Sequence, residues 1–295
     1  MGLAIFTSVR AAFTAATGGC VGFVSMLVII NHLVCADFVH TSCEIAAGNY
    51  HSLILRKDGT VGATGINYYG QLGDGTNIDK TRFVKVFSSG AVEVAAGFSH
   101  SMVLRSDGSV WGTGHNMYGQ LGDWTKRDRN RFKRVTSGAS AVVAGGAHTL
   151  VLKRDGSVMA SGNNMYGQLG DSTLKNKKYF VTVMSSAATM AAGADHSVVL
   201  RRDGNVWAAG RNNYGQLGDG TNQAKKGFVL ITSSVENIAA GAYHSIVLKT
   251  DGSVWTVGDN QHGQLGYRWV DAAYDYVRVF YNQATAVAAG GHHRW

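Results

Sequence analysis

A repeat of about 48 residues runs through most of this 295-residue chain and limits what it can fold into. The tetrapeptide GQLG, a histidine and an Asp-Gly pair recur five times in step. The tetrapeptide begins at Gly70, Gly119, Gly167, Gly215 and Gly263; the histidines are His51, His100, His148, His196 and His244; the aspartates are Asp58, Asp107, Asp155, Asp203 and Asp251. Three markers that share one period indicate an array of equivalent structural units.

Each unit has the pattern of four short strands. In the second unit we expect strands over 92–96, 101–105, 109–113 and 131–135, with a hairpin turn at Asp107-Gly108, where glycine supplies the positive φ that the turn needs. The second strands are nearly continuous aliphatic runs, which suit strands covered on both faces. No part of the unit has a useful 3.6-residue period, so helical repeats are excluded. The pattern predicts an all-β fold, a β-propeller of four-stranded blades.

The repeats resemble a known family once they are aligned. They share the pattern AAG-x-x-H-S-x-x-L-x-x-DG-x-V-x-x-x-G-x-N-x-x-GQLG-D, which resembles the regulator-of-chromosome-condensation repeat over residues 44–291. The resemblance implies a seven-bladed propeller. It also implies one of several functions, because the family includes nuclear exchange factors for a small GTPase, modules inside ubiquitin ligases and secreted propellers that inhibit β-lactamases.

The number of repeats departs from that family. The units span about 44–91, 92–140, 141–188, 189–236 and 237–285, and a partial sixth occupies 286–295. Five full units cannot build seven blades, so the ring closes with fewer blades, stays open, or belongs to a truncated chain. We favour an incomplete array, whose open strand edges would be sites of self-association.

The N-terminal segment differs from the rest. Residues 11–36 carry no formal charge, and 21–30 is an almost unbroken apolar run after Arg10. We interpret 1–36 as a secretory signal peptide, with 11–35 as a membrane anchor in the alternative, and 37–43 as a short linker. Both interpretations place the repeats outside the cytosol. A misassigned start would instead leave the protein in the cytoplasm or nucleus.

The recurring His and Asp residues invite a catalytic or metal-binding interpretation, which their repetition opposes. A catalytic site needs unlike residues at one place, whereas these are spread evenly over the array. We expect each histidine to hydrogen-bond within its own blade. All three cysteines (Cys20, Cys35 and Cys43) precede the repeats, and the terminal His292-His293 pair is a weak metal candidate. We therefore predict no enzyme activity, catalytic residue, metal or cofactor.

Function is expected where the repeats differ. The formal net charge is +8, and the second unit carries a cationic stretch over 124–134. A protein partner, acidic in character, would use basic and aromatic loop residues: Trp124, Lys126, Arg127, Arg129, Arg131, Lys133 and Arg134, with Tyr267 and Trp269 from the fifth unit. Two alternatives stay open: guanine-nucleotide exchange on a small GTPase, which rests on the resemblance alone, and chromatin or nucleic-acid docking through the basic loops.

Overall fold

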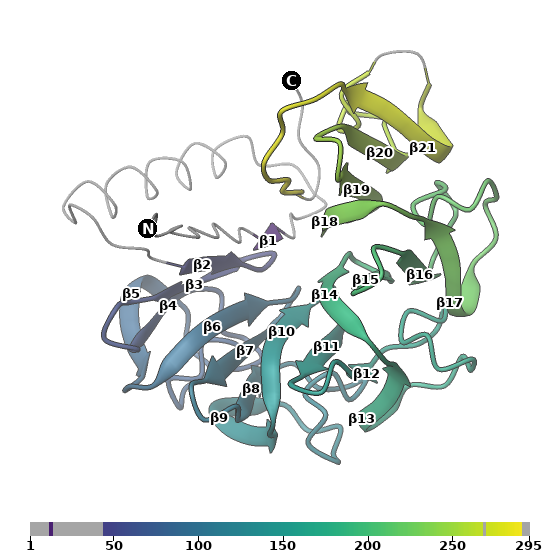
Figure 1. Ribbon diagram of the computed structural model, residues 1–295. Helices are drawn as coiled ribbons and strands as arrows, with labels where there is room; N and C mark the ends of the chain where they lie inside the picture. The colour runs from purple at the N-terminus through teal and green to yellow at the C-terminus, as the bar shows by residue number, and fades with distance from the viewer. Residues whose placement is uncertain (1–11, 14–43, 268–269, 291–295) are drawn as a thin grey trace.

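Five four-stranded antiparallel sheets, one for each repeat, form the fold of the protein in a computed structural model. The structure describes residues 12–13, 44–267 and 270–290. Within each sheet the strands follow one another in chain order, so every blade is built from its own repeat. We call the sheets blades one to five. Figure 1 shows them side by side in an arc, with the first strand of each blade toward the centre and the fourth at the rim.

The strand bounds are nearly the same in each repeat. Blade one has β2 (Glu44–Ala47), β3 (His51–Leu55), β4 (Val61–Gly65) and β5 (Lys80–Phe87); blade two has β6 (Ala91–Ala96), β7 (His100–Arg105), β8 (Val110–Gly114) and β9 (Arg129–Thr136); blade three has β10 (Ala139–Ala144), β11 (His148–Lys153), β12 (Val158–Gly162) and β13 (Lys177–Met184); blade four has β14 (Ala187–Ala192), β15 (His196–Arg201), β16 (Val206–Gly210) and β17 (Lys225–Thr232); blade five has β18 (Val235–Ala240), β19 (His244–Lys249), β20 (Val254–Asp259) and β21 (Ala272–Phe280). The strands expected in the second unit are confirmed to within two residues.

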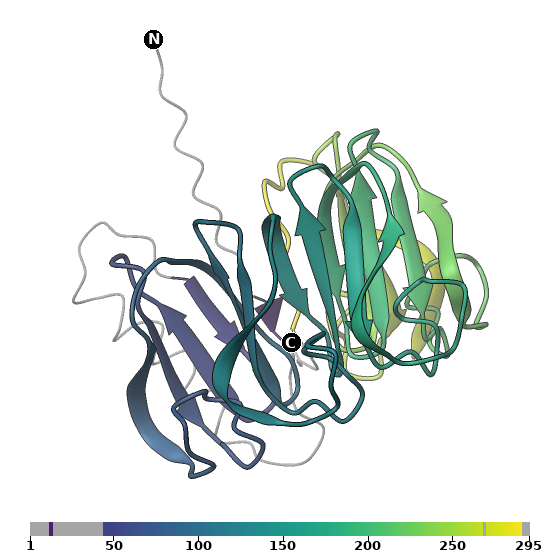
Figure 2. The ribbon, with the colours of Figure 1, turned by 90° about the horizontal axis from the view of Figure 1, so that it is seen from below.

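The prediction of an all-β propeller with five full blades is therefore confirmed. The five sheets stay separate, and no strand pairing joins the last sheet to the first among the described residues. Neighbouring blades stack face to face, as Figure 2 shows. The partial sixth repeat forms no strand over 286–290, the part of it that the structure describes. Among the described residues no helix is long and apolar enough to cross a bilayer. The predicted signal or anchor at 1–36, the linker at 37–43 and the His292-His293 pair lie outside the described residues, except for β1 (Ala12–Phe13), which pairs in parallel with β2.

Apolar side chains between the blades form the core. The second strands are buried along almost their whole length, as predicted from their unbroken aliphatic runs. Between blades one and two, for example, Leu53 and Val61 pack against Val94 and Val103 of the next blade. Each further junction between neighbouring blades repeats this arrangement. The burial of both faces of every inner sheet is what holds the arc together.

The repeated histidines also join blades, which corrects the expectation that each bonds within its own blade. The His51 Nε2 atom lies 2.9 Å from the Ser101 hydroxyl of blade two, and that hydroxyl donates to the Gln71 carbonyl of blade one at 2.7 Å. His100, His148 and His196 reach Thr149, Ser197 and Ser245 in the same way. Because each hydroxyl gives its one proton to the glutamine carbonyl, the histidine Nε2 must be the donor. The sequence could not show this, since the acceptor belongs to the next repeat.

Glycine allows the blades to approach so closely. A Cβ atom on Gly97 would lie 2.2 Å from the His100 ring and 2.4 Å from the Gly145 carbonyl of the next blade. The Asp-Gly hairpins are also confirmed: Gly108 has a φ of 81°, and Asp107 accepts hydrogen bonds from the backbone and hydroxyl of Ser109. The recurrent residues therefore maintain the shape of the blades.

Candidate functional site

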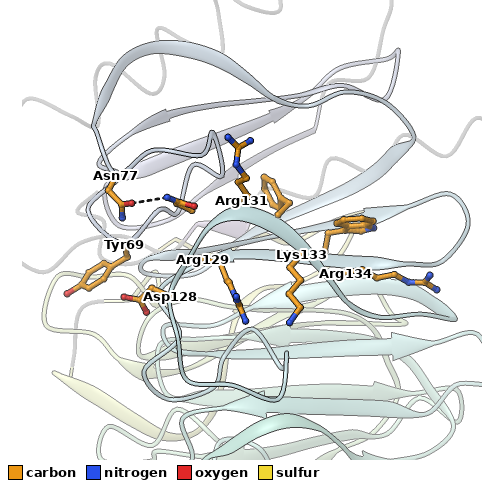
Figure 3. A pocket seen from close by; sticks show the side chains of 10 residues that line it. Tyr69, Asn77, Asp128, Arg129, Arg131, Lys133 and Arg134 are labelled. Carbon is orange, nitrogen blue, oxygen red and sulfur yellow. Dashed lines mark hydrogen bonds between the residues drawn. The ribbon is translucent and has the colours of Figure 1, made fainter.

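The cationic stretch of the second repeat continues into strand β9 at the rim of blade two. Residues 129–134 lie on this strand, so the cations from Arg129 onward are strand residues and not loop residues. A register shift against β8 distorts the strand between Arg129 and Lys133. Such a bulge changes the side to which successive side chains point. Figure 3 shows Arg129 and Lys133 pointing together to one side and Arg131 to the other.

Two of the predicted binding residues are committed to an ion pair within blade two. The Arg129 Nη2 and Nε atoms lie 2.6 and 2.9 Å from Asp123 Oδ2, and Lys133 Nζ lies 3.4 Å from the same oxygen. The Asp123 side chain is fully buried. Burial alone raises the pKa of Asp123, but hydrogen bonds from Thr125 and Arg129 outweigh it and lower that pKa to about 2. This pair is part of the framework of the blade.

The equivalent pair in other blades supports that conclusion. The aspartate after GQLG meets the first cation of the fourth strand as Lys80–Asp74, Lys177–Asp171 and Lys225–Asp219, at 3.1, 3.0 and 2.9 Å. In blade five both partners are absent together, because Tyr267 follows GQLG and Ala273 replaces the cation. Lysine at 133 is the exception in the array, since the equivalent residues are Val84, Val181, Val229 and Val277.

Arg131 and Arg134 line an open pocket between blades one and two, together with the paired Arg129 and Lys133. Its volume is about 840 Å³, and it is lined by Tyr69 and Asn77 from blade one and by Trp111 and residues 128–134 from blade two. Asn130 closes one end through hydrogen bonds to Asn77 and to the Gly75 carbonyl, the first of which is dashed in Figure 3. Arg131 and Arg134 are exposed and form no ion pair among the residues that the structure describes. We call this pocket the basic groove.

An aromatic platform lies on the other side of blade two. Trp124 stacks on Tyr179 of blade three, with ring centroids 4.5 Å apart and an interplanar angle of 17°. Trp124 nevertheless remains 67% exposed, and it has a φ of 70°. A bulky residue in this left-handed region is strained, and glycine occupies the equivalent position in blades one and four. Lys126 and Arg127 follow it in the loop and are exposed. The exposed ring of Trp124 is therefore held on a strained backbone.

The aromatic residues predicted in the fifth unit are placed differently. Tyr267 packs against the small apolar cluster of blade five around Val257 and Leu265. Burial raises the pKa of its hydroxyl. Trp269 lies outside the described residues. Among the described residues no group of three or more His, Cys, Asp or Glu side chains is arranged to hold a metal ion.

Comparison with known proteins gives the family. The sequence over residues 27–295 matches the RCC1-like domain. The chain therefore belongs to the RCC1-like domain family. This establishes the resemblance to the regulator-of-chromosome-condensation repeat that the recurrent motifs indicate. No curated protein matches the sequence significantly.

Several solved structures share the fold. Human WBSCR16 superposes with a TM-score of 0.75 and 25% sequence identity, covering 84% of this chain and 69% of that one. Prp20p from Saccharomyces cerevisiae gives a TM-score of 0.64 at 20% identity, covering 84% and 80%. Yeast RCC1 (Prp20) solved with Kap60 gives 0.63 at 18%, covering 80% and 74%. These likenesses establish the fold, and a shared fold does not by itself specify a function.

Proposed function

We propose that this RCC1-like chain is a non-catalytic scaffold that binds an acidic segment of a partner protein on blade two. The observation that carries the proposal is the set of exposed cations that remain after the framework pairs are formed: Lys126, Arg127, Arg131 and Arg134. Lys126 and Arg127 follow the exposed Trp124 in its loop, and Arg131 and Arg134 line the basic groove between blades one and two. Arginine and tryptophan are the residues that most often dominate binding energy at interfaces.

The contrast with blades three to five supports this location. The residues equivalent to Arg131 are Arg82 in blade one and Tyr179, Gly227 and Asp275 in blades three to five; those equivalent to Arg134 are Lys85, Thr182, Leu230 and Arg278. None of blades three to five therefore has both cations. The yeast neighbour Prp20 binds Kap60, and its structure was described with its binding to Gsp1p and histones. These neighbours support a protein partner for the fold, whereas the acidic character of the partner rests on the basic groove.

The test compares two variants of equal charge loss. Arg127, Arg131 and Arg134 are changed to serine, and Arg129 is left in place because its loss would expose the buried Asp123. In the matched control Arg56, Lys57 and Arg202, which are exposed near the opposite ends of the strands, are changed to serine. A fluorescent 12-residue peptide rich in Asp and Glu serves as the probe, and a 16-base-pair DNA duplex is measured in parallel.

Exposed charge pairs contribute about 0.2–1 kcal/mol each, so we expect the first variant to bind the peptide about tenfold more weakly and the control to bind like the native protein. Binding should weaken with added salt. Equal loss in both variants would show that only net charge matters and would refute the assignment to blade two. Tight binding of the duplex without binding of the peptide would instead establish a nucleic-acid surface.

A further inference from the structure

Two exposed apolar side chains lie at the loop end of the basic groove. Tyr68 and Ile78 belong to the loop of blade one between β4 and β5, and they are 72% and 67% exposed. Asn77, which lines the groove, donates from its side chain to the Tyr68 carbonyl at 2.9 Å. The buried Asn67 side chain donates to the Ile78 carbonyl at 3.2 Å. These two bonds cross the loop and hold Tyr68 and Ile78, which we call the apolar lip, beside the groove.

Alignment of the repeats shows that the apolar lip is peculiar to blade one. The residues equivalent to Ile78 are all polar: Arg127, Lys175, Gln223 and Asp271. Those equivalent to Tyr68 are Met117, Met165, Asn213 and Gln261, so no other blade is apolar at both positions. The fold does not require an apolar residue at position 78, because the other blades form with a polar one. Adjoining exposed apolar groups at such a place indicate contact with another molecule.

Aromatic contacts connect the apolar lip to the wall of the basic groove. Tyr68 meets Tyr69 edge to face, with ring centroids 4.8 Å apart, and Tyr69 lines the groove. The Tyr69 ring in turn lies 4.4 Å from the ring of His115 in blade two. The lip and the groove are therefore parts of one continuous surface across blades one and two.

The charge of the basic groove changes along its length. Figure 3 shows Tyr69, Asn77 and Asp128 at one end of the groove, and Lys133 and Arg134 toward the other. Asp128 is exposed, so its carboxylate would repel an acidic residue that lay beside the lip. Acidic residues of a partner are therefore accommodated toward the cationic end, and an uncharged residue is accommodated at the lip.

We propose that the partner segment places a bulky apolar residue on Tyr68 and Ile78 while its acidic residues occupy the basic groove. This inference rests on the proposed function and adds a second element of recognition to it. Contact between the lip and an apolar side chain is favourable in proportion to the area that both remove from water. An acidic segment without such a residue would bind by charge alone, so the lip discriminates among acidic partners.

Peptides of equal charge separate the two elements of recognition. The acidic 12-residue peptide is compared with two versions that carry one phenylalanine, at the N-terminal or at the C-terminal end, and fluorescence polarisation gives the Kd of each for the full chain. We expect one of the two versions to bind about tenfold more tightly than the plain peptide. The end that responds gives the direction in which the segment lies. Because this gain comes from apolar contact, it should persist at high salt, where binding of the plain peptide weakens.

Two double variants locate the gain on the protein. Tyr68→Ser with Ile78→Ser removes the lip, and Leu230→Ser with Tyr281→Ser is the matched control, because these two side chains are also exposed but belong to blades four and five. In the lip variant we expect the gain from phenylalanine to disappear and the affinity for the plain peptide to stay nearly unchanged. In the control we expect both to match the native chain.

The outcomes distinguish this inference from the proposed function. A native chain that binds the plain peptide but gains nothing from phenylalanine at either end would overturn the inference and leave the acidic partner of the basic groove in place. A gain that survives in the lip variant, or that is lost equally in the control, would overturn it as well. Failure of all three peptides to bind would refute the proposed function together with the inference.

Discussion

Acid should unfold this protein through its buried histidines. Burial lowers the pKa of His51 and His148 to about 4, and burial with neighbouring histidines lowers that of His100 and His196 to about 3. An unfolded histidine titrates near 6.5. Below that pH these histidines bind protons in the unfolded chain but stay neutral in the folded chain. A lowered histidine pKa therefore costs nothing at neutral pH and destabilises the fold as the pH falls from about 6.5 toward 4.

The size of this effect follows from the interval between the two pKa values. At pH 5 each of the four rings costs about 2 kcal/mol, or about 8 kcal/mol together. At pH 6 the four together cost about 3 kcal/mol. A domain is ordinarily stable by about 5–15 kcal/mol. We therefore expect a steep loss of structure near pH 5, well above the range in which the carboxylates titrate.

Two variants of one relay separate protonation from the hydrogen bond itself. His148→Gln keeps a side-chain amide able to donate to Ser197 but removes the titrating group. Ser197→Ala keeps the histidine and removes its acceptor, the Ser197 hydroxyl, which lies 2.9 Å from His148 Nε2 in the native chain. Urea unfolding followed by far-ultraviolet circular dichroism at pH 7.5 and pH 5 gives the free energy of unfolding for each.

We expect His148→Gln to become about 2 kcal/mol more stable relative to the native protein on going from pH 7.5 to pH 5. Ser197→Ala should cost about 1–3 kcal/mol at both pH values, because the loss of an acceptor does not depend on pH in this range. A native stability that stays constant down to pH 5 would refute the reasoning, as would the same pH dependence in His148→Gln and the native chain.

Three further predictions concern single positions. Gly108→Val should destabilise the hairpin by about 1–2 kcal/mol, because φ is 81° there and a Cβ would lie 3.0 Å from an Arg154 nitrogen; an unchanged melting temperature would contradict the assigned turn. Trp124→Gly should be about 1 kcal/mol more stable than Trp124→Ala in chemical denaturation, since only glycine relieves the left-handed backbone while both lose the ring. Asp123→Asn should lower the melting temperature at pH 7 by weakening the buried pairing with Arg129 and Lys133, as thermal unfolding followed by circular dichroism will show; an unchanged melting temperature would contradict the structural role of the pair.

Most of the blade could be predicted from the sequence because its determinants are local. Aliphatic runs and Asp-Gly turns act within a few residues, so they placed the strands of the second unit to within two positions. The histidine relay could not be predicted, because its acceptor belongs to a different repeat. The availability of Arg129 for binding was overestimated for a different reason: Asp123 belongs to the same repeat, but the sequence does not show that its carboxylate folds against Arg129.

The setting of Arg211 had a signal in the sequence that alignment of the repeats reveals. The position after the third strand holds Ile66, His115, Asn163, Arg211 and Asp259, so only blade four has a cation there. What the sequence does not show is which side chains surround Arg211. The structure shows that Arg211 faces Asp195 and lies over the rings of Tyr166 and Tyr243.

Departures from the repeat differ in whether the surrounding structure compensates them. Lys133 replaces a valine, and Asp123 meets its charge within the same blade, so this change is complete in itself. Trp124 introduces strain that its stack on Tyr179 does not remove. An uncompensated change lowers stability, and it persists only where something else offsets the loss. In a fold whose recurrent residues all serve its shape, Trp124 is therefore where a partner is expected to make contact.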